Sequence, residues 1–285
     1  MAQNVKPETT SPLLHALALG LAVQIVGVLP FSWLLSANLA YGTSVPWACA
    51  AEIVLLVLLC SYLRGSGWPT STSFQRRKLF RASLPDAPLL FPVTIATGLL
   101  AISIGLLIIL MFMLVQYPVN AGDTFLALAA APPVTAVTLI LTLAVMTGIV
   151  EEGAFRGYMQ VSLEEAHGPV LAVPVVAVAF TVAHWPPPLV IPLFIVGASG
   201  WSILAWLANS TIPGMIAHAV VDAVFLLWVW REPQAFRDLL SRSVIESGPD
   251  PVFWVTAVAT VFSVALTGIA FAWLGNRREK PEIRE

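Results

Sequence analysis

The chain contains 285 residues, of which 58% are hydrophobic and 11% are charged, and its formal net charge is −2. Soluble globular domains carry far more charge, so the composition excludes that class and indicates an integral membrane protein. The basic residues form no soluble patch that would bind a nucleic acid, and we expect no nucleic-acid partner. We expect a single membrane domain over residues 1–285, surrounded by the lipid bilayer.

Apolar stretches along the chain are separated by turn-forming or basic segments. Most of them approach or exceed the roughly 20 residues that a membrane-spanning helix requires. They predict an all-α, polytopic transmembrane bundle of about eight spans. The expected spans are residues 12–36, 45–63, 88–115, 133–155, 169–186, 189–208, 212–231 and 251–275.

Lysine and arginine are distributed unevenly between the two sets of loops that eight spans create. Eleven of the 14 basic residues belong to one set, which consists of Lys6, residues 64–86, Arg156 and the C-terminal tail. The other set holds the remaining three. Because basic residues favour the cytoplasmic side of a membrane, we expect both termini to be cytoplasmic.

Ionisable residues inside the expected spans gather in the second half of the chain. Each costs about 2.5–3.5 kcal/mol near the bilayer centre, so each is a candidate functional residue. The first three spans contribute only His15 and Glu52. The region between residues 151 and 222 contributes Glu151, Glu152, Arg156, His184, His218 and Asp222.

The first group is the stretch TGIVEEGAFRGYMQ, residues 147–160. Glu152 and Arg156 are four residues apart, so on a helix they share a face and can pair. Glu151 points about 100° away and stays free for other interactions. The alternative is that both acids lie among lipid headgroups at the end of a helix.

The second group is FTVAHWPPPL, in which Phe180 and His184 share a helical face. Three prolines, residues 186–188, end the helix just after the histidine. Non-helical backbone at this depth is tolerated only where protein or a water-filled cavity surrounds it, which predicts that His184 lines a pocket. The alternative is an interfacial histidine beside Trp185.

The third group is NSTIPGMIAHAVVDAV, in which Ser210 or Thr211 can cap a helix with Pro213 in its first turn. His218 and Asp222 then lie one turn apart on a common face, near the middle of the seventh span. The alternative is a structural hydrogen bond between helices.

These side chains together contain what water activation requires. Glu151 can accept a proton from water, and His184 or His218 can orient that water or protonate a leaving group. Two histidines with one or two carboxylates, Asp222 included, also match the ligands of catalytic zinc sites, so the spacing leaves zinc open as a cofactor. The chain has no HExxH, GxSxG or GxGD pattern around these residues.

The three groups, in this order, resemble the motifs of the CPBP family of membrane proteases. That family includes the type II CAAX prenyl endopeptidases and bacterial bacteriocin-processing or immunity homologues, and its pattern is EExxxR, FxxxH and HxxxN or HxxxD. A catalytic core within residues 120–231 would carry the motifs. The matching stretches are Glu151-Glu152-Gly-Ala-Phe-Arg156, Phe180-Thr-Val-Ala-His184 and His218-Ala-Val-Val-Asp222.

The resemblance implies an intramembrane endopeptidase whose cavity opens to the cytosol. Glu151 with His184 would activate the attacking water, and His218 with Asp222 would stabilise the oxyanion. We expect this mechanism to need no cofactor; a metal-dependent version would use the same four side chains as ligands. The supporting residues would be Glu152, Arg156 and Phe180.

Asp222 departs from the asparagine that is commoner at this position of the family. An ionised aspartate accepts hydrogen bonds but donates none to an oxyanion. We therefore expect Asp222 either to be protonated or to orient a protonated His218.

The expected spans place Glu151 and His184 at different depths, since Glu151 is near the inner end of one span and His184 near the outer end of the next. For the two to meet, either the fourth span must begin later than residue 133, which places Glu151 deeper, or the prolines must end the helix of His184 within the membrane. We expect both.

These observations predict hydrolysis of a peptide bond in a membrane protein or lipidated peptide, prenylated CAAX proteins among them. The compact length fits a multi-pass protein of a prokaryotic cell membrane with its active site open to the cytoplasmic side. A proton-coupled transporter is an alternative, because acids and histidines within spans also relay protons, although the chain shows no internal repeat. A non-catalytic immunity or scaffold protein of the same fold is another.

Overall fold

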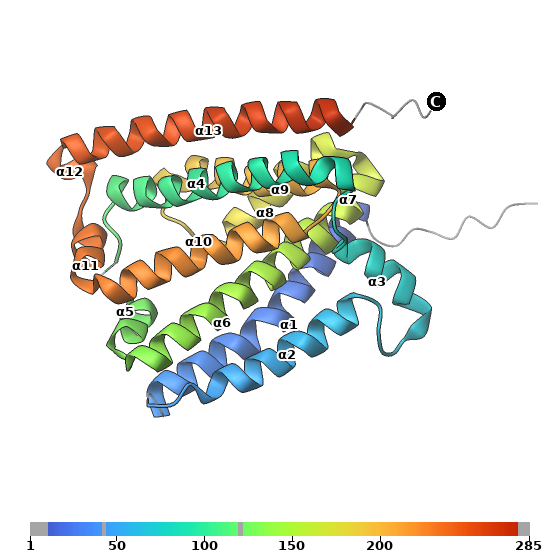
Figure 1. Ribbon diagram of the computed structural model, residues 1–285, viewed down its shortest axis with the longest axis horizontal. Coiled ribbons are helices and arrows are strands. Elements are labelled where there is room, and N and C mark those ends of the chain that lie inside the picture. The colour runs from blue at the N-terminus through green and yellow to red at the C-terminus, as the bar shows by residue number, and fades with distance from the viewer. Residues whose placement is uncertain (1–10, 42–43, 119–121, 279–285) are drawn as a thin grey trace, which may run out of the picture.

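The computed structural model describes residues 11–41, 44–118 and 122–278. Within these ranges every regular element is a helix, and the helices form one bundle (Figure 1). Lys6, Lys280 and Arg284, which contribute to the expected charge asymmetry, lie outside the described residues. The expected all-α class is confirmed for the part of the chain that the structure describes.

Six helices in the described ranges are long and apolar enough to cross a membrane, as an integral membrane protein requires. Two further apolar helices are shorter, so the count of eight spans stays a prediction. The shorter helices are α2 (Trp47–Leu63) and α8 (Pro169–His184). The longer ones are α1 (Pro12–Tyr41), α4 (Leu90–Leu114), the continuous helix Pro133–His167, α9 (Ile191–Ala208), α10 (Ile212–Arg231) and α13 (Pro251–Arg278).

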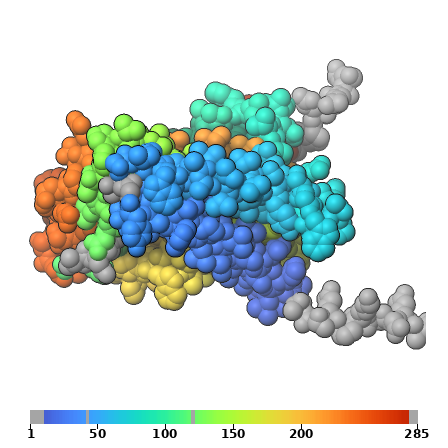
Figure 2. Space-filling view, turned by 90° about the horizontal axis from the view of Figure 1, so that it is seen from below, coloured from blue at the N-terminus to red at the C-terminus, as the bar shows by residue number. Residues whose placement is uncertain are grey.

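Short helices gather at the two opposite ends of the bundle (Figure 1). We call one the α3 end, formed by η1 (Thr70–Thr72), α3 (Ser73–Phe80), η2 (Ala87–Leu89) and the last turns of helix 133–167 and α13. We call the other the α11 end, formed by α5 (Asp123–Ala130), α11 (Pro233–Ser241) and α12 (Val244–Ser247). A last short helix, η4 (Pro188–Val190), precedes α9. In Figure 2, α1 and α2 lie side by side over one face of the bundle, with α3 beyond them.

The fourth expected span is wrong at its C-terminal boundary. The helix that starts at Pro133 continues past residue 155 to His167 through α6 (Pro133–Glu151), η3 (Glu152–Met159) and α7 (Gln160–His167). Its polar last turns resemble a loop in sequence, but Glu164 pairs with Arg81 at 2.8 Å and is stabilised by this contact with a distant segment. The helix ends at Gly168, whose φ of 78° suits a residue without a side chain.

The segment η3 is a π-helix that contains the whole EExxxR motif except its first residue. A π-helix bonds each N–H to the carbonyl five residues earlier, and such segments are frequent at functional sites. All eight residues of η3 are buried, including Glu152 and Arg156. The two charges are therefore held inside the bundle and do not lie among headgroups.

Helices α6 and α10 approach closely at Gly148. A side-chain carbon at this position would lie 2.7 Å from the Met215 carbonyl and 3.0 Å from the Ala219 nitrogen. Only glycine fits without displacing α10, because real contacts of a Cβ atom are longer than this. This close contact brings the motif of α10 against the motif that begins at Glu151.

Candidate active site

Side chains from three helices converge near the middle of the bundle. Oε2 of Glu151, at the end of α6, lies 3.6 Å from Nε2 of His184 and 3.8 Å from Nε2 of His218. The same His218 nitrogen lies 3.8 Å from Oδ2 of Asp222, one turn further along α10. The structure therefore brings together all four of the residues expected to be catalytic. At these separations, an oxygen atom of a water or substrate can bridge the groups.

The depths of Glu151 and His184 match because α7 and α8 form a helical hairpin. Helix 133–167 and α8 run antiparallel on either side of Gly168, and the two residues lie almost equally far from that turn along the chain. Since each helical residue adds about 1.5 Å, equal arms reach equal depth. The fourth span does not begin later than expected, because its helix starts at Pro133; it ends later instead, at His167, so Glu151 lies in the middle of the helix. Helix α8 ends at His184, just before the prolines.

Glu151 is well placed to act as a base. Its side chain is 11% exposed, and within the described ranges its Oε2 atom is buried without a hydrogen-bond partner. A buried carboxylate without a hydrogen-bond partner destabilises the folded protein unless a neighbouring proton donor or positive charge compensates for the lost water. A protonated histidine on either side can compensate in this way, and the carboxylate remains available to a bound water.

His184 is fixed by contacts within its own helix. Its Nδ1 atom donates a hydrogen bond of 2.7 Å to the Phe180 carbonyl, so Nε2 faces Glu151. The rings of Phe180 and His184 are 4.2 Å apart between centroids. Two lone pairs facing each other would repel, so a proton on Nε2 or on the Glu151 carboxylate would favour this approach. The proton on Nδ1 is assigned from its hydrogen bond to the Phe180 carbonyl.

The pair Glu152–Arg156, expected from the four-residue spacing, is present. Arg156 donates hydrogen bonds to Oε1 of Glu152 at 3.1 Å and to the Ala198 carbonyl at 3.0 Å. Its guanidinium also lies over the Phe180 ring, 4.3 Å from the centroid. Both charged side chains are fully buried, so the pair holds helix 133–167 against α8 and α9.

Glu152 has a second partner that the sequence did not indicate. Nδ1 of His218 lies 3.0 Å from Oε1 of Glu152. Because a carboxylate accepts hydrogen bonds, Nδ1 carries a proton, and Nε2 is directed towards Glu151 and Asp222. Glu152 therefore orients the His218 imidazole as well as neutralising Arg156.

Two further residues of the site were missed at the sequence level. Thr147, one turn before Glu151, donates a 2.6 Å hydrogen bond to Oδ2 of Asp222. Trp201 on α9 stacks on the His218 ring, with centroids 5.5 Å apart and an interplanar angle of 11°. Thr147 could have been predicted, because it lies four residues before Glu151 and so on the same helical face. Nothing in the sequence indicates that Trp201 contacts His218.

A cavity of about 1100 Å³ adjoins the site. His184, His218 and Asp222 line it, and most of its wall is apolar or aromatic. Among the described residues, no three His, Cys, Asp or Glu side chains are grouped so that they could hold a metal ion. The wall also contains Thr147, Phe180, Trp201, Phe112, Tyr117, Phe125, Phe225 and Phe236.

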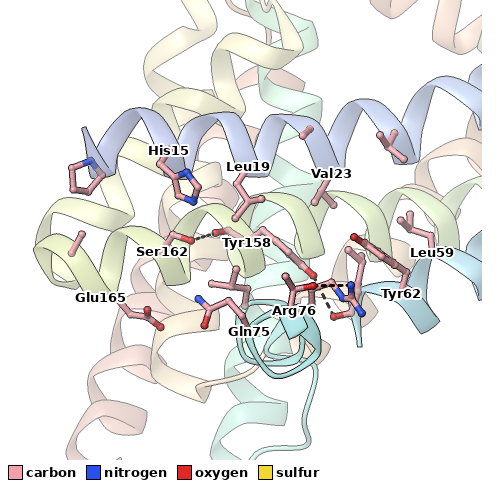
Figure 3. Close-up of a pocket in the computed structure, with 17 residues that line it drawn as sticks. His15, Leu19, Val23, Leu59, Tyr62, Gln75, Arg76, Tyr158, Ser162 and Glu165 are labelled. Atoms are coloured by element: carbon pink, nitrogen blue, oxygen red, sulfur yellow. Dashed lines mark hydrogen bonds between the residues drawn. The ribbon is translucent and has the colours of Figure 1, made fainter. Parts of the chain in front are cut away.

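A second cavity of about 690 Å³ lies between α1, α2, α3 and the end of helix 133–167 (Figure 3). Tyr158 forms part of its wall and donates a hydrogen bond of 3.3 Å to the Leu63 carbonyl. None of the four residues expected to be catalytic lines it. It is a separate feature of the α3 end.

Residues 133–224 match the model of a family described as type II CAAX prenyl endopeptidase Rce1-like. The match runs from the start of α6 into α10 and contains all three motifs. These residues therefore form an Rce1-like domain, and the resemblance to the CPBP proteases is confirmed. Neither the curated proteins nor the solved structures contain a match to the chain.

Proposed function

We propose that the chain is an intramembrane endopeptidase in which Glu151 and His184 activate a water molecule. The observation that carries the proposal is the 3.6 Å approach of these two side chains, from separate helices, next to a 1100 Å³ cavity. The Rce1-like family is a protease family, which supports peptide-bond hydrolysis as the reaction.

In the proposed reaction, a water molecule bound between Glu151 and His184 attacks the carbonyl carbon of the scissile peptide bond. The Glu151–His184 pair takes up the proton that the water loses, and the carbonyl oxygen becomes an oxyanion. When the carbon–nitrogen bond breaks, the pair returns a proton to the departing amine. The products are a new carboxyl terminus and a new amino terminus.

His218 would stabilise the oxyanion through the proton on Nε2. Its Nδ1 proton is committed to Glu152, so Nε2 is the nitrogen that can reach a substrate. Charge-assisted donors of this kind are aimed where negative charge develops in the transition state. Asp222, 3.8 Å from Nε2, would favour the protonated ring and is itself held by Thr147.

We propose a membrane protein or lipidated peptide as the substrate, with a prenylated CAAX protein as one case. The largely apolar wall of the cavity supports this class, because it can accept an apolar segment while the reacting bond reaches the polar cluster. The mechanism as proposed uses protein side chains without a cofactor. Eight spans, cytoplasmic termini and a prokaryotic membrane remain predictions from the sequence.

The test uses the purified full-length protein in proteoliposomes with a panel of prenylated and unprenylated reporter peptides. Glu151→Gln should lower the cleavage rate by a factor of about 10² or more, because the substitution removes the base and preserves the shape. Glu165→Gln is the matched control, since Glu165 is a half-exposed acid that pairs with Lys78 at 2.8 Å. Equal cleavage by the Glu151→Gln variant and the parent would refute the proposal.

A chelator arm in the same assay tests the mechanism. We expect cleavage to continue after chelation of divalent metals. Loss of cleavage that zinc restores would assign the site to metal-assisted hydrolysis, with the same four side chains as ligands.

A further inference from the structure

The second cavity, at the α3 end, has a polar end and an apolar end (Figure 3). His15, Gln75 and Ser162 line its polar end, beside the last turns of helix 133–167. Its apolar end lies between α1 and α2, where Val26 and Leu59 form part of the wall. This division suits an amphiphile, whose polar head and hydrocarbon tail need different surroundings.

The cavity is long enough for an acyl chain and lies between two apolar helices. From His15 to Val26 it follows α1 for roughly 16 Å, at about 1.5 Å per residue. The hydrocarbon core of a bilayer is about 30 Å thick, so one leaflet has a similar depth. Val26 of α1 is 64% exposed and Tyr62 of α2 is 43% exposed, although both line the cavity. The cavity is therefore a groove on the surface of the bundle, which a lipid can enter from the membrane.

Arg76 brings a positive charge to this groove, and no carboxylate in the described ranges pairs with it. The residue lines the groove and is only 5% exposed. Its guanidinium has neutral partners there, namely carbonyl and hydroxyl oxygens at 2.9–3.3 Å and the Tyr62 ring at 4.1 Å. Its Nε atom is buried without a partner among the described residues. Buried charges are normally paired with an opposite charge, so an anion in the groove would compensate Arg76.

The surroundings of the polar end are basic and suit a membrane–water boundary. Glu165 lines the groove, but its charge is offset by Lys78 at 2.8 Å, and the neighbouring Arg77 is exposed. Trp68 and Phe74, just before and within α3, are 86% and 77% exposed, as aromatic side chains at such a boundary are. Basic pockets between membrane helices near a boundary bind the headgroups of anionic lipids.

The groove also touches the helix that carries Glu151. Leu79 of α3 and Tyr158 of helix 133–167 both line it. Arg81, just after α3, fastens the two elements together by hydrogen bonds to the Glu164 side chain at 2.8 Å and to the Arg156 carbonyl at 3.1 Å. A molecule in the groove would contact α3 and this helix at once and would stabilise their packing near Arg156.

We infer that the groove binds an anionic phospholipid. One acyl chain lies along α1 and α2, and the phosphate lies towards the polar end. There His15 and the Gln75 amide can donate hydrogen bonds, and Arg76 supplies the positive charge. The bound lipid stabilises α3 against helix 133–167. The binding site is independent of the reaction, and only its effect on cleavage rests on the proposed function.

Thermal unfolding of the purified full-length protein in detergent micelles tests the site. The micelles contain either phosphatidylglycerol, which is anionic, or phosphatidylcholine with the same acyl chains. A ligand that binds only the folded state raises Tm. Phosphatidylglycerol should raise Tm by about 2–4 °C more than phosphatidylcholine does. Equal shifts by the two lipids would overturn the inference.

Two pairs of variants locate the bound lipid. Val26→Trp fills the apolar end and should abolish the extra shift, whereas Ile25→Trp, at an exposed position outside the groove, should keep it. Gln75→Glu adds a negative charge at the polar end, where the Gln75 side chain is exposed, and should at least halve the extra shift. Gln116→Glu makes the same change at an exposed glutamine far from α3 and should keep the shift. Loss of the shift in both members of a pair, or in neither, would contradict the location.

The competing occupant of the groove is the lipid anchor of a substrate. A prenylated peptide added to the same micelles tests this alternative. If the peptide raises Tm of the parent but not of the Val26→Trp variant, and phosphatidylglycerol acts no more strongly than phosphatidylcholine, the groove is a substrate site. That result would overturn the assignment to a phospholipid.

The effect on cleavage is measured in phosphatidylcholine proteoliposomes with and without phosphatidylglycerol. The reporter peptide carries no net charge, so that the lipid does not recruit it. The parent should cleave at least threefold faster with phosphatidylglycerol, and the Val26→Trp variant should not respond. Equal parent rates in the two membranes would contradict the stabilising role of the lipid. A parent that cleaves nothing in either membrane would refute the proposed function, and the unfolding measurements would still decide whether the lipid binds.

Discussion

Oε2 of Glu151 and Nε2 of His184 lie 3.6 Å apart, on two helices that run in opposite directions and are joined through Gly168. The hairpin has arms of nearly equal length, so its two chemically active residues face each other at one depth. His218, from a third helix, comes within 3.8 Å of the same Glu151 oxygen. The proposed hydrolysis depends on this approach of Glu151 to His184.

Arg156→Ala should destabilise the protein strongly. Arg156 is fully buried and pairs with Glu152, so its removal leaves a buried carboxylate with less compensation. Breaking a buried ion pair in this way costs about 3–5 kcal/mol. Denaturant unfolding in detergent micelles would measure the loss, with the exposed Arg77→Ala as the control. A loss no larger than that of the control would show that Glu152 needs no guanidinium partner.

Asp222→Asn should retain cleavage within about tenfold of the parent, whereas Asp222→Leu should lose it. The asparagine oxygen can still accept the bond from Thr147, and its amide can donate to an oxyanion, which an ionised aspartate cannot. Rates measured at saturating reporter would separate these variants. If the asparagine variant is as slow as the leucine variant, the negative charge of Asp222 is required.

Gly148→Ala should lower the cleavage rate more than it lowers stability. The added carbon would lie 2.7 Å from the Met215 carbonyl, so α10 must move and carry His218 away from Glu151. A displacement of even 1 Å can cost about 10² in rate. Gly268→Ala is the matched control, because nothing lies within 4 Å of the position that its side chain would occupy. Equal rates for the two variants would contradict the proposed role of the helix contact.

Much of the helical arrangement could be predicted from the sequence because apolar length and helix-breaking residues determine it. The expected starts at Pro12, Pro133, Pro169, Ile212 and Pro251 agree with the structure. The pairing of Glu152 with Arg156 followed from helical spacing alone. Such features depend on neighbours within one turn, which sequence periodicity reports directly.

The features that could not be predicted depend on contacts between distant segments. The polar residues after 155 stay helical because Lys78 of α3 pairs with Glu165, and Arg81, just after α3, pairs with Glu164. The stacking of Trp201 on His218 and the hydrogen bond from the Thr211 hydroxyl to the Phe80 carbonyl also require the assembled bundle.

The most direct test of the account is a double-mutant cycle on Glu151 and His184 in the reconstituted cleavage assay. The variants are Glu151→Gln, His184→Ala and the combination of both, with single-turnover rates and unfolding measured for each. If the two side chains activate one water together, the double variant should be no slower than the slower single variant. Effects that multiply, or a single variant that cleaves at the parent rate, would contradict the account.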